Sequence, residues 1–413
     1  MGPNLRAIVV IAALTMTLPT AEPAFSQKPD GILSVHQYDN PPSLSIHEEV
    51  TYATDVPMMG VFNNLVMYKQ DEPKNSLQSI VPDLAKSWSW SEDGTQLTFR
   101  LREGVKWHDG KPFTANDVKC TWDMLLGSSN EKPRTNPRKA WYQNLAEVTT
   151  DGDFAAVFHL KRPQPALIAL LASGYSPVYP CHVSPREMRQ HPIGGPFKLV
   201  EFKPNESIKL ARNPDYWKMD RPYLDGIEYT IIQNRSTAIL SFIVGKLDMT
   251  FPYQVTVPLL KDVNGQAPKA ICELRTTNSA GTLIINRQSA PFDNPDLRRA
   301  VALALDRKSF VDILTEGQGK IGGAMLPPPE GAWGMPPDLV ETLPGYDPDV
   351  QKSRTRAREL MEKLDYGPDK RLRVKVSARN VADLRSRGDS DRPVERNLHR
   401  WRTRRRRDHR LVF

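Results

Sequence analysis

The stretch "REGVKWHDGKPFTANDV", residues 102–118, decides the fold. Asp109 and Gly110 are turn-forming residues that separate two short runs. Thr114 then precedes a helical run, and Asp117, three residues later, completes a weak capping box. The stretch therefore predicts a tight hairpin that feeds directly into a capped helix.

Two strands are predicted just before this hairpin. Leu97, Phe99 and Leu101 occupy alternate positions, as they do when one face of a strand is buried. Asp93 and Gly94 provide the turn between the two strands. Strands, hairpin and helix together predict a small α+β unit.

The rest of the chain predicts further helices and strands, separated by loops that are rich in its 36 prolines. The strands are expected at 197–202, 207–212, 224–234, 283–286 (buried) and 371–378. The helices are expected at 57–68 (from the spacing of Val61, Leu65 and Tyr68), 235–245 (ending at Gly245), 294–306 (N-cap Asn294) and 353–367 (C-cap Gly367). The Pro-rich segment 325–337 predicts a surface loop.

The N-terminus has the layout of a cleavable secretory signal, predicted over residues 1–26. Arg6 precedes an apolar run, residues 7–18, and small residues follow. About 12 apolar residues are too few for the roughly 20 that span a bilayer. No Cys follows the run, which argues against a lipoprotein signal. The product is therefore expected to be exported.

The charge is concentrated at the C-terminus. Residues 385–413 contain eleven Arg and four acids, so they carry +7 of the formal net charge of +8. The preceding 384 residues are almost neutral. A run this basic also allows an alternative of another class, a protein that binds nucleic acid or a membrane surface through its tail.

The sequence shows no catalytic or metal-binding constellation. It lacks GxSxG, GxxxxGK, CxxC and HExxH motifs, and its eight His are dispersed. Three Cys allow one disulfide at most. We therefore expect no enzyme, no cofactor and no metal site.

Four ordered blocks resemble the signatures of family 5 extracellular solute-binding proteins, the dipeptide, oligopeptide and nickel receptors of ABC importers. The resemblance covers about residues 32–375. The blocks are "VPDLAKSWSWSEDGTQLTFRLREGVKWHDGKPFTANDV" (81–118), "GGPFKL" (194–199), "NPDYWKMDRPYLDGI" (213–227) and "NRQSAPFDNPDLRRAVALALDR" (286–307).

The resemblance implies the α+β, two-lobed type II periplasmic binding protein fold, with α/β-like lobes and three domains, the last incomplete. Lobe I is expected to be discontinuous and to lack its C-terminal return. The expected units are the signal peptide (1–26), lobe I (27–57 and 190–280), a second domain on its side (58–189), a partial lobe II (281–384) and an aberrant Arg-rich tail (385–413).

The resemblance also implies a function in solute uptake. We expect a periplasmic monomer that binds a peptide between its lobes and delivers it to an inner-membrane ABC permease, without a nucleic-acid partner. Nickel, haem, opines and sugars stay open as ligands, because members of a fold family share a scaffold while their pockets differ.

Candidate ligand-binding residues follow from their expected places at the cleft. Glu48 and Glu49 could meet a ligand cation; the alternative is a solvated helix start. Trp333 could offer an aromatic wall or merely cover a core edge. The full set of candidates is Tyr38, Asn40, Glu48, Glu49, Asn278, Ser279 and Trp333.

The family-like pattern stops near residue 382. Residues 385–393 and 397–407 can be encoded so that a frame displaced by one nucleotide reads "DPAVILIDQ" and "IYIDGELDVVE", a helix-like and a strand-like run. We therefore hypothesise a frameshift near 382–384 that truncates the native C-terminus. Such a product is expected to be poorly stable or to aggregate, and to bind peptide weakly or not at all.

Overall fold

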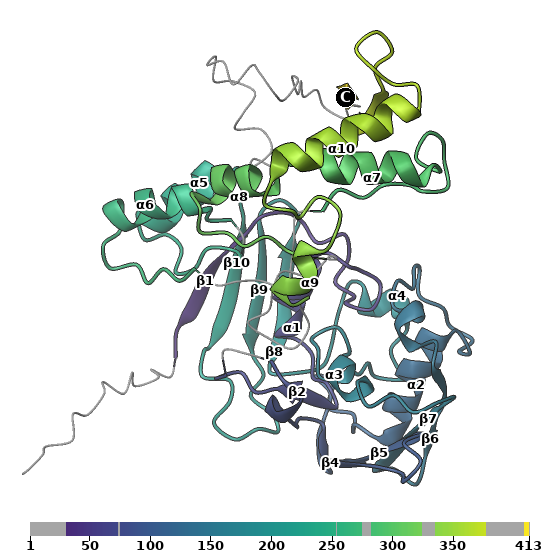
Figure 1. Ribbon diagram of the computed structural model, residues 1–413. Helices are drawn as coiled ribbons and strands as arrows, with labels where there is room; N and C mark the ends of the chain where they lie inside the picture. The colour runs from purple at the N-terminus through teal and green to yellow at the C-terminus, as the bar shows by residue number, and fades with distance from the viewer. Residues whose placement is uncertain are drawn as a thin grey trace, which may run out of the picture.

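The computed structural model is an α+β protein with two four-stranded β-sheets, two small two-stranded sheets and a layer of helices (Figure 1). It describes residues 30–72, 75–252, 254–274, 282–323, 335–376 and 409–412.

The first sheet has the strand order β1–β10–β9–β8. β1 runs parallel to β10, and the other pairs are antiparallel. Buried side chains such as Val35, Ile208 and Tyr229 attach this sheet to the main core. The strands are β1 (Ile32–Gln37), β8 (Phe197–Lys203), β9 (Ser207–Arg212) and β10 (Gly226–Ile231).

The second sheet is fully antiparallel and has the order β4–β5–β7–β6. Helix α2 (Ala115–Leu126) packs on it through Trp122, whose ring centroid lies 4.8 Å from that of Phe158. Phe99 meets Phe158 at 5.4 Å, so aromatic contacts fill this core. The strands are β4 (Ala85–Trp90), β5 (Gln96–Leu101), β6 (Leu145–Thr150) and β7 (Ala155–Leu160).

The hairpin and helix predicted from residues 102–118 are confirmed. Gly110 takes a left-handed φ of 85° in the turn. The Thr114 amide donates to Asp117 Oδ2 at 2.8 Å, and α2 begins at the next residue after Thr114. The predicted pairs β4–β5 and β8–β9 are also confirmed.

Short elements lie between the strands of the two four-stranded sheets, and one disulfide bonds α2 to the segment before α4 (Pro185–Met188). Cys120 on α2 is bonded to Cys181, 61 residues later. Cys272 is free, which agrees with the prediction of at most one bridge. The connecting elements are α1 (Tyr52–Met59), β2 (Val66–Tyr68), η1 (Leu77–Ser79), β3 (Ile80–Pro82), η2 (Lys139–Tyr142), α3 (Leu167–Leu171) and α4 (Pro185–Met188).

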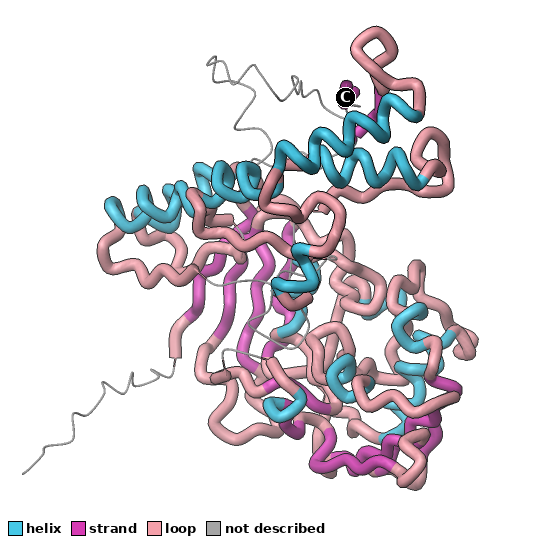
Figure 2. The backbone as a smooth tube through the Cα atoms, viewed as in Figure 1, coloured by secondary structure: helices cyan, strands magenta, loops and turns pink. Residues whose placement is uncertain are grey.

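Most helices from the second half of the chain lie at one end of the first sheet, whereas the short helix Pro337–Glu341 lies lower in this view (Figure 1 and Figure 2). Helix α7 packs against α10, and a small second core joins Leu297 to Leu372 and Val374. These helices are α5 (Arg235–Ile243), α6 (Val257–Gln266), α7 (Pro295–Ala304), α8 (Arg307–Thr315), α9 (Pro337–Glu341) and α10 (Val350–Lys363). A two-stranded sheet follows them, β11 (Arg373–Val376) with β12 (His409–Val412).

The helix predicted over 57–68 is wrong. The helix of this region is α1, which ends at Met59, and Val66–Tyr68 instead pairs with Ile80–Pro82 as β2. Leu65 and Val66 are both fully buried although they are neighbours, which one helical face does not allow. Pairing with a distant segment has overridden the local spacing.

The buried strand predicted at 283–286 is also wrong. Leu283 is 43% exposed and Ile284 87% exposed, and the segment has no strand partner among the described residues. Without a paired neighbour, an apolar run has nothing to bury its backbone against.

Two predicted helix ends are corrected. Asn294 caps α7 as expected, but α7 ends at Ala304, and Asp306 instead accepts from the Ser309 amide as the N-cap of α8. Helix α10 ends at Lys363, and the left-handed residue beyond it is Asp365 rather than Gly367. The predicted domain boundaries stay a prediction.

Candidate functional site

The first part of the candidate site lies where β1 ends. The ring of Tyr38 packs at 4.8 Å from the ring of Phe251. The side-chain Nδ2 of Asn40 donates to Asn205 Oδ1 at 2.6 Å, and the main-chain N–H of Asn205 donates to Asn40 Oδ1 at 2.6 Å. Asn205 lies in the β8–β9 turn, so the predicted residue Asn40 fastens that turn to the end of β1.

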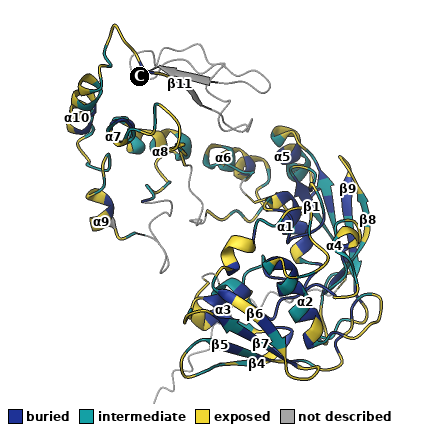
Figure 3. Cartoon of the chain, turned by 90° about the vertical axis from the view of Figure 1, so that its right-hand side faces the viewer, coloured by how far each residue is buried: buried dark blue, intermediate teal, exposed yellow. Residues whose placement is uncertain are grey.

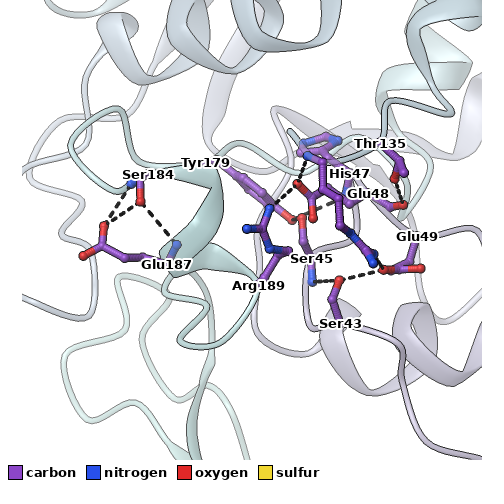
Figure 4. Close-up of polar contacts among 11 residues, drawn as sticks. Ser43, Ser45, His47, Glu48, Glu49, Thr135, Tyr179, Ser184, Glu187 and Arg189 are labelled. Atoms are coloured by element: carbon purple, nitrogen blue, oxygen red, sulfur yellow. Dashed lines mark hydrogen bonds and ion pairs between the residues drawn. The ribbon is translucent and has the colours of Figure 1, made fainter. Parts of the chain in front are cut away.

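The second part is a cluster of buried acids, from the segment that leads from β1 into α1, and of arginines from later segments of the chain (Figure 4). Glu48 Oε1 accepts from the Arg134 main-chain N at 2.7 Å and from Arg189 Nη1 at 3.0 Å. Glu49 Oε1 accepts from Ser43 Oγ at 2.8 Å and pairs with the Arg134 guanidinium. The alternative of a solvated helix start is wrong for this pair, since only 3% of Glu48 and 8% of Glu49 are exposed.

A third ion pair lies deeper. Arg138 Nη2 is 3.7 Å from Asp55 Oδ1, and both side chains are fully buried. The Arg138 guanidinium also lies over the rings of Trp141 (5.1 Å) and Tyr175 (4.9 Å). Burial raises the pKa of Asp55 to about 7, while attraction by Arg138 works in the opposite direction.

His47 and Tyr179 brace the segment from the inside. His47 Nε2 lies 2.8 Å from the Pro177 carbonyl oxygen, and a carbonyl only accepts, so Nε2 carries the proton. Burial lowers the pKa of His47 to about 3, so the ring is neutral at physiological pH. Tyr179 OH shares a hydrogen bond with Ser45 Oγ at 3.2 Å. Both side chains hold the backbone in place rather than supply a nucleophile or a base.

The three ion pairs differ in how far solvent reaches them. The Arg138–Asp55 pair is closed, and the Glu48 side chain is only 1% exposed. The Arg134 side chain is 51% exposed, although its partner Glu49 is largely covered. Arg134 therefore carries the most exposed charge of the three pairs.

The structure thus brings some of the predicted residues together and not others. Glu48 and Glu49 share one cluster, while Tyr38 and Asn40 lie at the end of the first sheet. Asn278, Ser279 and Trp333 lie outside the described residues.

Sequence reasoning missed the basic half of the cluster and Asp55. Arg134 and Arg138 occur in "PRTNPRKAWY", where arginines stand among turn residues and aromatics. An arginine next to aromatic rings is a signal for a stacked, buried guanidinium. An acid inside the otherwise apolar α1 points in the same way to a buried partner.

Within the described ranges, no group of three His, Cys, Asp or Glu could hold a metal ion. Among the same residues, none of the helices combines the length and the apolar character that crossing a membrane requires.

The family of bacterial extracellular solute-binding proteins, family 5 Middle, matches residues 79–392. The chain belongs to this family. The match ends inside the Arg-rich segment. Members of this family bind solutes rather than catalyse reactions. The predicted fold class and family are confirmed.

Curated relatives of this family 5 protein include two from different bacteria. Di/tripeptide-binding protein 1 of Pseudomonas aeruginosa (strain UCBPP-PA14) is 26% identical over 73% of this chain and 57% of its own length. Heme-binding protein A of Haemophilus influenzae is 27% identical over 74% of this chain and 56% of its own length. The chain therefore spans somewhat more than half the length of these relatives.

Solved structures show the same fold. Helicobacter pylori DppA in complex with the peptide STSA has a TM-score of 0.67 at 23% identity, over 82% of this chain and 67% of its own. Haemophilus influenzae OppA in complex with RPPGFSPFR has a TM-score of 0.68 at 23% identity, over 84% of this chain and 68% of its own.

Proposed function

We propose that this protein binds short peptides as the receptor component of an ABC importer. The observation that carries the proposal is the family match over residues 79–392, together with a di/tripeptide-binding relative at 26% identity. Binding needs a place for charged chain ends, and we propose the acid–arginine cluster as that place.

The cluster suggests how a peptide ammonium is held. Glu49 is paired with the half-exposed Arg134, so an ammonium can take the place of that guanidinium without leaving a buried charge unpaired. Glu48 suits this role less, because its accepting oxygen bonds to the Arg134 main chain and to Arg189. Glu49 is therefore the ligand residue that we favour in this cluster. We propose the ring of Tyr38, at the end of β1, as an apolar wall for another part of the ligand.

The remaining predicted residues complete the proposed site. Asn278 and Ser279 would supply polar contacts and Trp333 an aromatic wall, as expected from their places in the sequence. Asn40 would act indirectly, since its amide is bonded to Asn205.

The cellular setting is part of the same proposal. The signal-like N-terminus and the Cys120–Cys181 disulfide both support export to the periplasm, because stable disulfides form in oxidising compartments. Delivery to an inner-membrane permease follows from the role of the family.

A second candidate ligand is haem, favoured by the haem-binding relative at 27% identity. Haem carries two carboxylates and a large apolar ring. Exposed arginine next to apolar surface suits those carboxylates, whereas a peptide also requires an acid for its ammonium. The cluster contains both charges, which favours the peptide.

Saturation-transfer NMR on the full chain tests the proposal, because the method also detects weak binding. We expect transfer to Ala-Ala and Ala-Ala-Ala, with a Kd of about 1 mM or below. Haem, mannopine, glucose and nickel serve as competing solutes in parallel samples. Competition by haem but not by peptides, or no transfer to any peptide, contradicts the proposal.

A further inference from the structure

Three helices at the end of the first sheet are poorly covered by the rest of the chain. Helix α6 contacts both α5 and α8, and it lies between them in Figure 3. Of their residues, α5 buries Ala238 and Ile239, α6 buries Val263, and α8 buries none. Helices of nine or ten residues are marginal in water unless an apolar face is packed. We call α5, α6 and α8 the outer helix layer.

Two of these helices expose apolar stripes instead of burying them. Leu240 on α5 and Val244 at its end are four residues apart, so they lie on one face, and they are 55% and 65% exposed. Phe310 and Ile313 on α8 are three residues apart, and they are 53% and 51% exposed. Eleven of the 20 exposed large apolar side chains in the described part of the chain fall between residues 235 and 341. Exposed apolar surface that gathers in this way marks an interaction site.

The outer helix layer carries no net charge. Together with the caps Asp306 and Glu316, its three helices hold four basic and four acidic residues. Lys261 on α6 pairs with Glu316 at the end of α8. Lys308 pairs with Asp312 within α8. A nucleic acid or an anionic membrane requires an excess of basic residues, whereas a neutral apolar layer can meet its own copy without repulsion.

The size of the layer also suits a contact between two copies of the chain. A standard interface takes about 20–30 residues from each partner. Helices α5, α6 and α8 contain nine, ten and nine residues. In a contact with twofold symmetry both copies use the same surface, so the assembly closes at two copies.

We propose that the outer helix layer is the surface through which two copies of this chain form a symmetric dimer. The stripe of Leu240 and Val244 and the stripe of Phe310 and Ile313 in each copy are buried against the helices of the other, which removes their apolar surface from water. The dimer replaces the monomer that is expected from the sequence.

This surface is separate from the peptide site of the proposed function. None of the residues of the acid–arginine cluster belongs to α5, α6 or α8. The test uses no peptide, so its failure leaves the proposed function untouched.

Sedimentation velocity on the full chain, from about 1 to about 100 μM, tests the proposal. We expect a conversion from monomer to dimer as the concentration rises, with no larger species. Hydrogen exchange at the two extreme concentrations locates the contact. We expect slower exchange at the higher concentration within residues 235–244, 257–266 and 307–315.

Two variants and a matched control test the residues. Val244→Asp is expected to weaken the dimer at least tenfold, because the contact would bury an unpaired carboxylate. Phe310→Asp tests the stripe on α8 in the same way and serves if far-UV circular dichroism shows that Val244→Asp does not fold. The control is Val200→Asp, because Val200 is the same residue type, is 63% exposed and lies on β8, outside the layer. We expect the control to form the dimer as the wild type does.

Several results overturn the proposal. One is a chain that stays monomeric at every concentration. Another is a dimer that survives both Val244→Asp and Phe310→Asp, or one that Val200→Asp weakens equally. Assemblies that grow beyond two copies overturn the symmetric contact. A monomer that instead sediments with vesicles of phosphatidylethanolamine and phosphatidylglycerol assigns the layer to a lipid surface and overturns the dimer.

Discussion

Removing the Cys120–Cys181 disulfide is predicted to cost stability without changing the folded structure. The segment around Cys181 is held to α2 by other bonds as well. The Cys181 amide donates to Asp117 Oδ1 at 2.7 Å, and the Tyr179 amide donates to Thr121 Oγ1 at 2.9 Å. These bonds persist in a Cys120→Ala, Cys181→Ala double variant, so the loss falls mainly on the unfolded state.

The size of the loss follows from the length of chain that the bond closes. A separation of 61 residues corresponds, in the chain-entropy description, to about 4 kcal/mol at 25 °C. For a domain of about 150–250 residues, a loss of this size lowers the melting temperature by roughly 8–16 °C.

Urea unfolding followed by tryptophan fluorescence measures the effect. Trp122, one of the eight tryptophans of the chain, is fully buried two residues from Cys120, so unfolding of this region contributes to the change in emission. Cys272→Ala is the matched control, because Cys272 is unpaired. We expect the control to unfold with the wild type and the double variant to unfold at lower urea with similar far-UV circular dichroism.

The reasoning is refuted if the double variant and the wild type share one unfolding midpoint. It is also refuted if the double variant loses its native circular dichroism before urea is added, because the remaining bonds would then be insufficient to hold the segment.

Three further perturbations have defined outcomes. The pKa of Asp55 in the folded protein, about 7, exceeds its ordinary value of 3.8. The free energy of unfolding should therefore be highest below pH 4 and fall by up to about 4 kcal/mol as the pH rises to 7. Asp55→Asn should flatten this pH dependence in urea titrations from pH 4 to 8. Phe158→Ala, in the aromatic core under α2, should cost about 3–5 kcal/mol in urea unfolding, and a loss below 1 kcal/mol would contradict the packing. Asn294→Ala should cost about 1 kcal/mol, because Asn294 Oδ1 accepts from the Asp296 amide at 2.8 Å; Asn294→Ser should restore most of it.

The local signals in the sequence were sufficient for the α+β units. Three of these signals are the cap at Thr114, the alternation at Leu97 and Phe99, and the cap at Asn294. In each case, nearby residues in the chain fix the local conformation. Such features depend on short-range hydrogen bonds and side-chain periodicity, so they can be read without tertiary knowledge.

The errors arise where a distant segment decides the outcome. The run at 57–68 has helical spacing, but Val66 lies opposite Pro82 in a strand pair. The run at 283–286 is apolar, yet Ile284 is exposed because no described strand covers it. Pairing partners far along the chain leave no trace in the local pattern.

The candidate site was predicted only in part for the same reason. Glu48 and Glu49 stand out as adjacent acids, but nothing near them in sequence indicates Arg134 or Arg189, which are 85 and 141 residues away from their partners. An acid that will be buried resembles one that will be solvated until its cation is known.

The most direct test of peptide binding at the cluster is the dissociation constant of Ala-Ala-Ala for the wild type and for Glu49→Gln, measured by NMR titration. The control is Glu228→Gln, a half-exposed acid on β10 that lies 3.8 Å from Lys209. We predict a saturable shift in the wild type, at least tenfold weaker binding in Glu49→Gln, and no change in the control. An unchanged constant in Glu49→Gln, or no saturable shift in the wild type, would contradict this account.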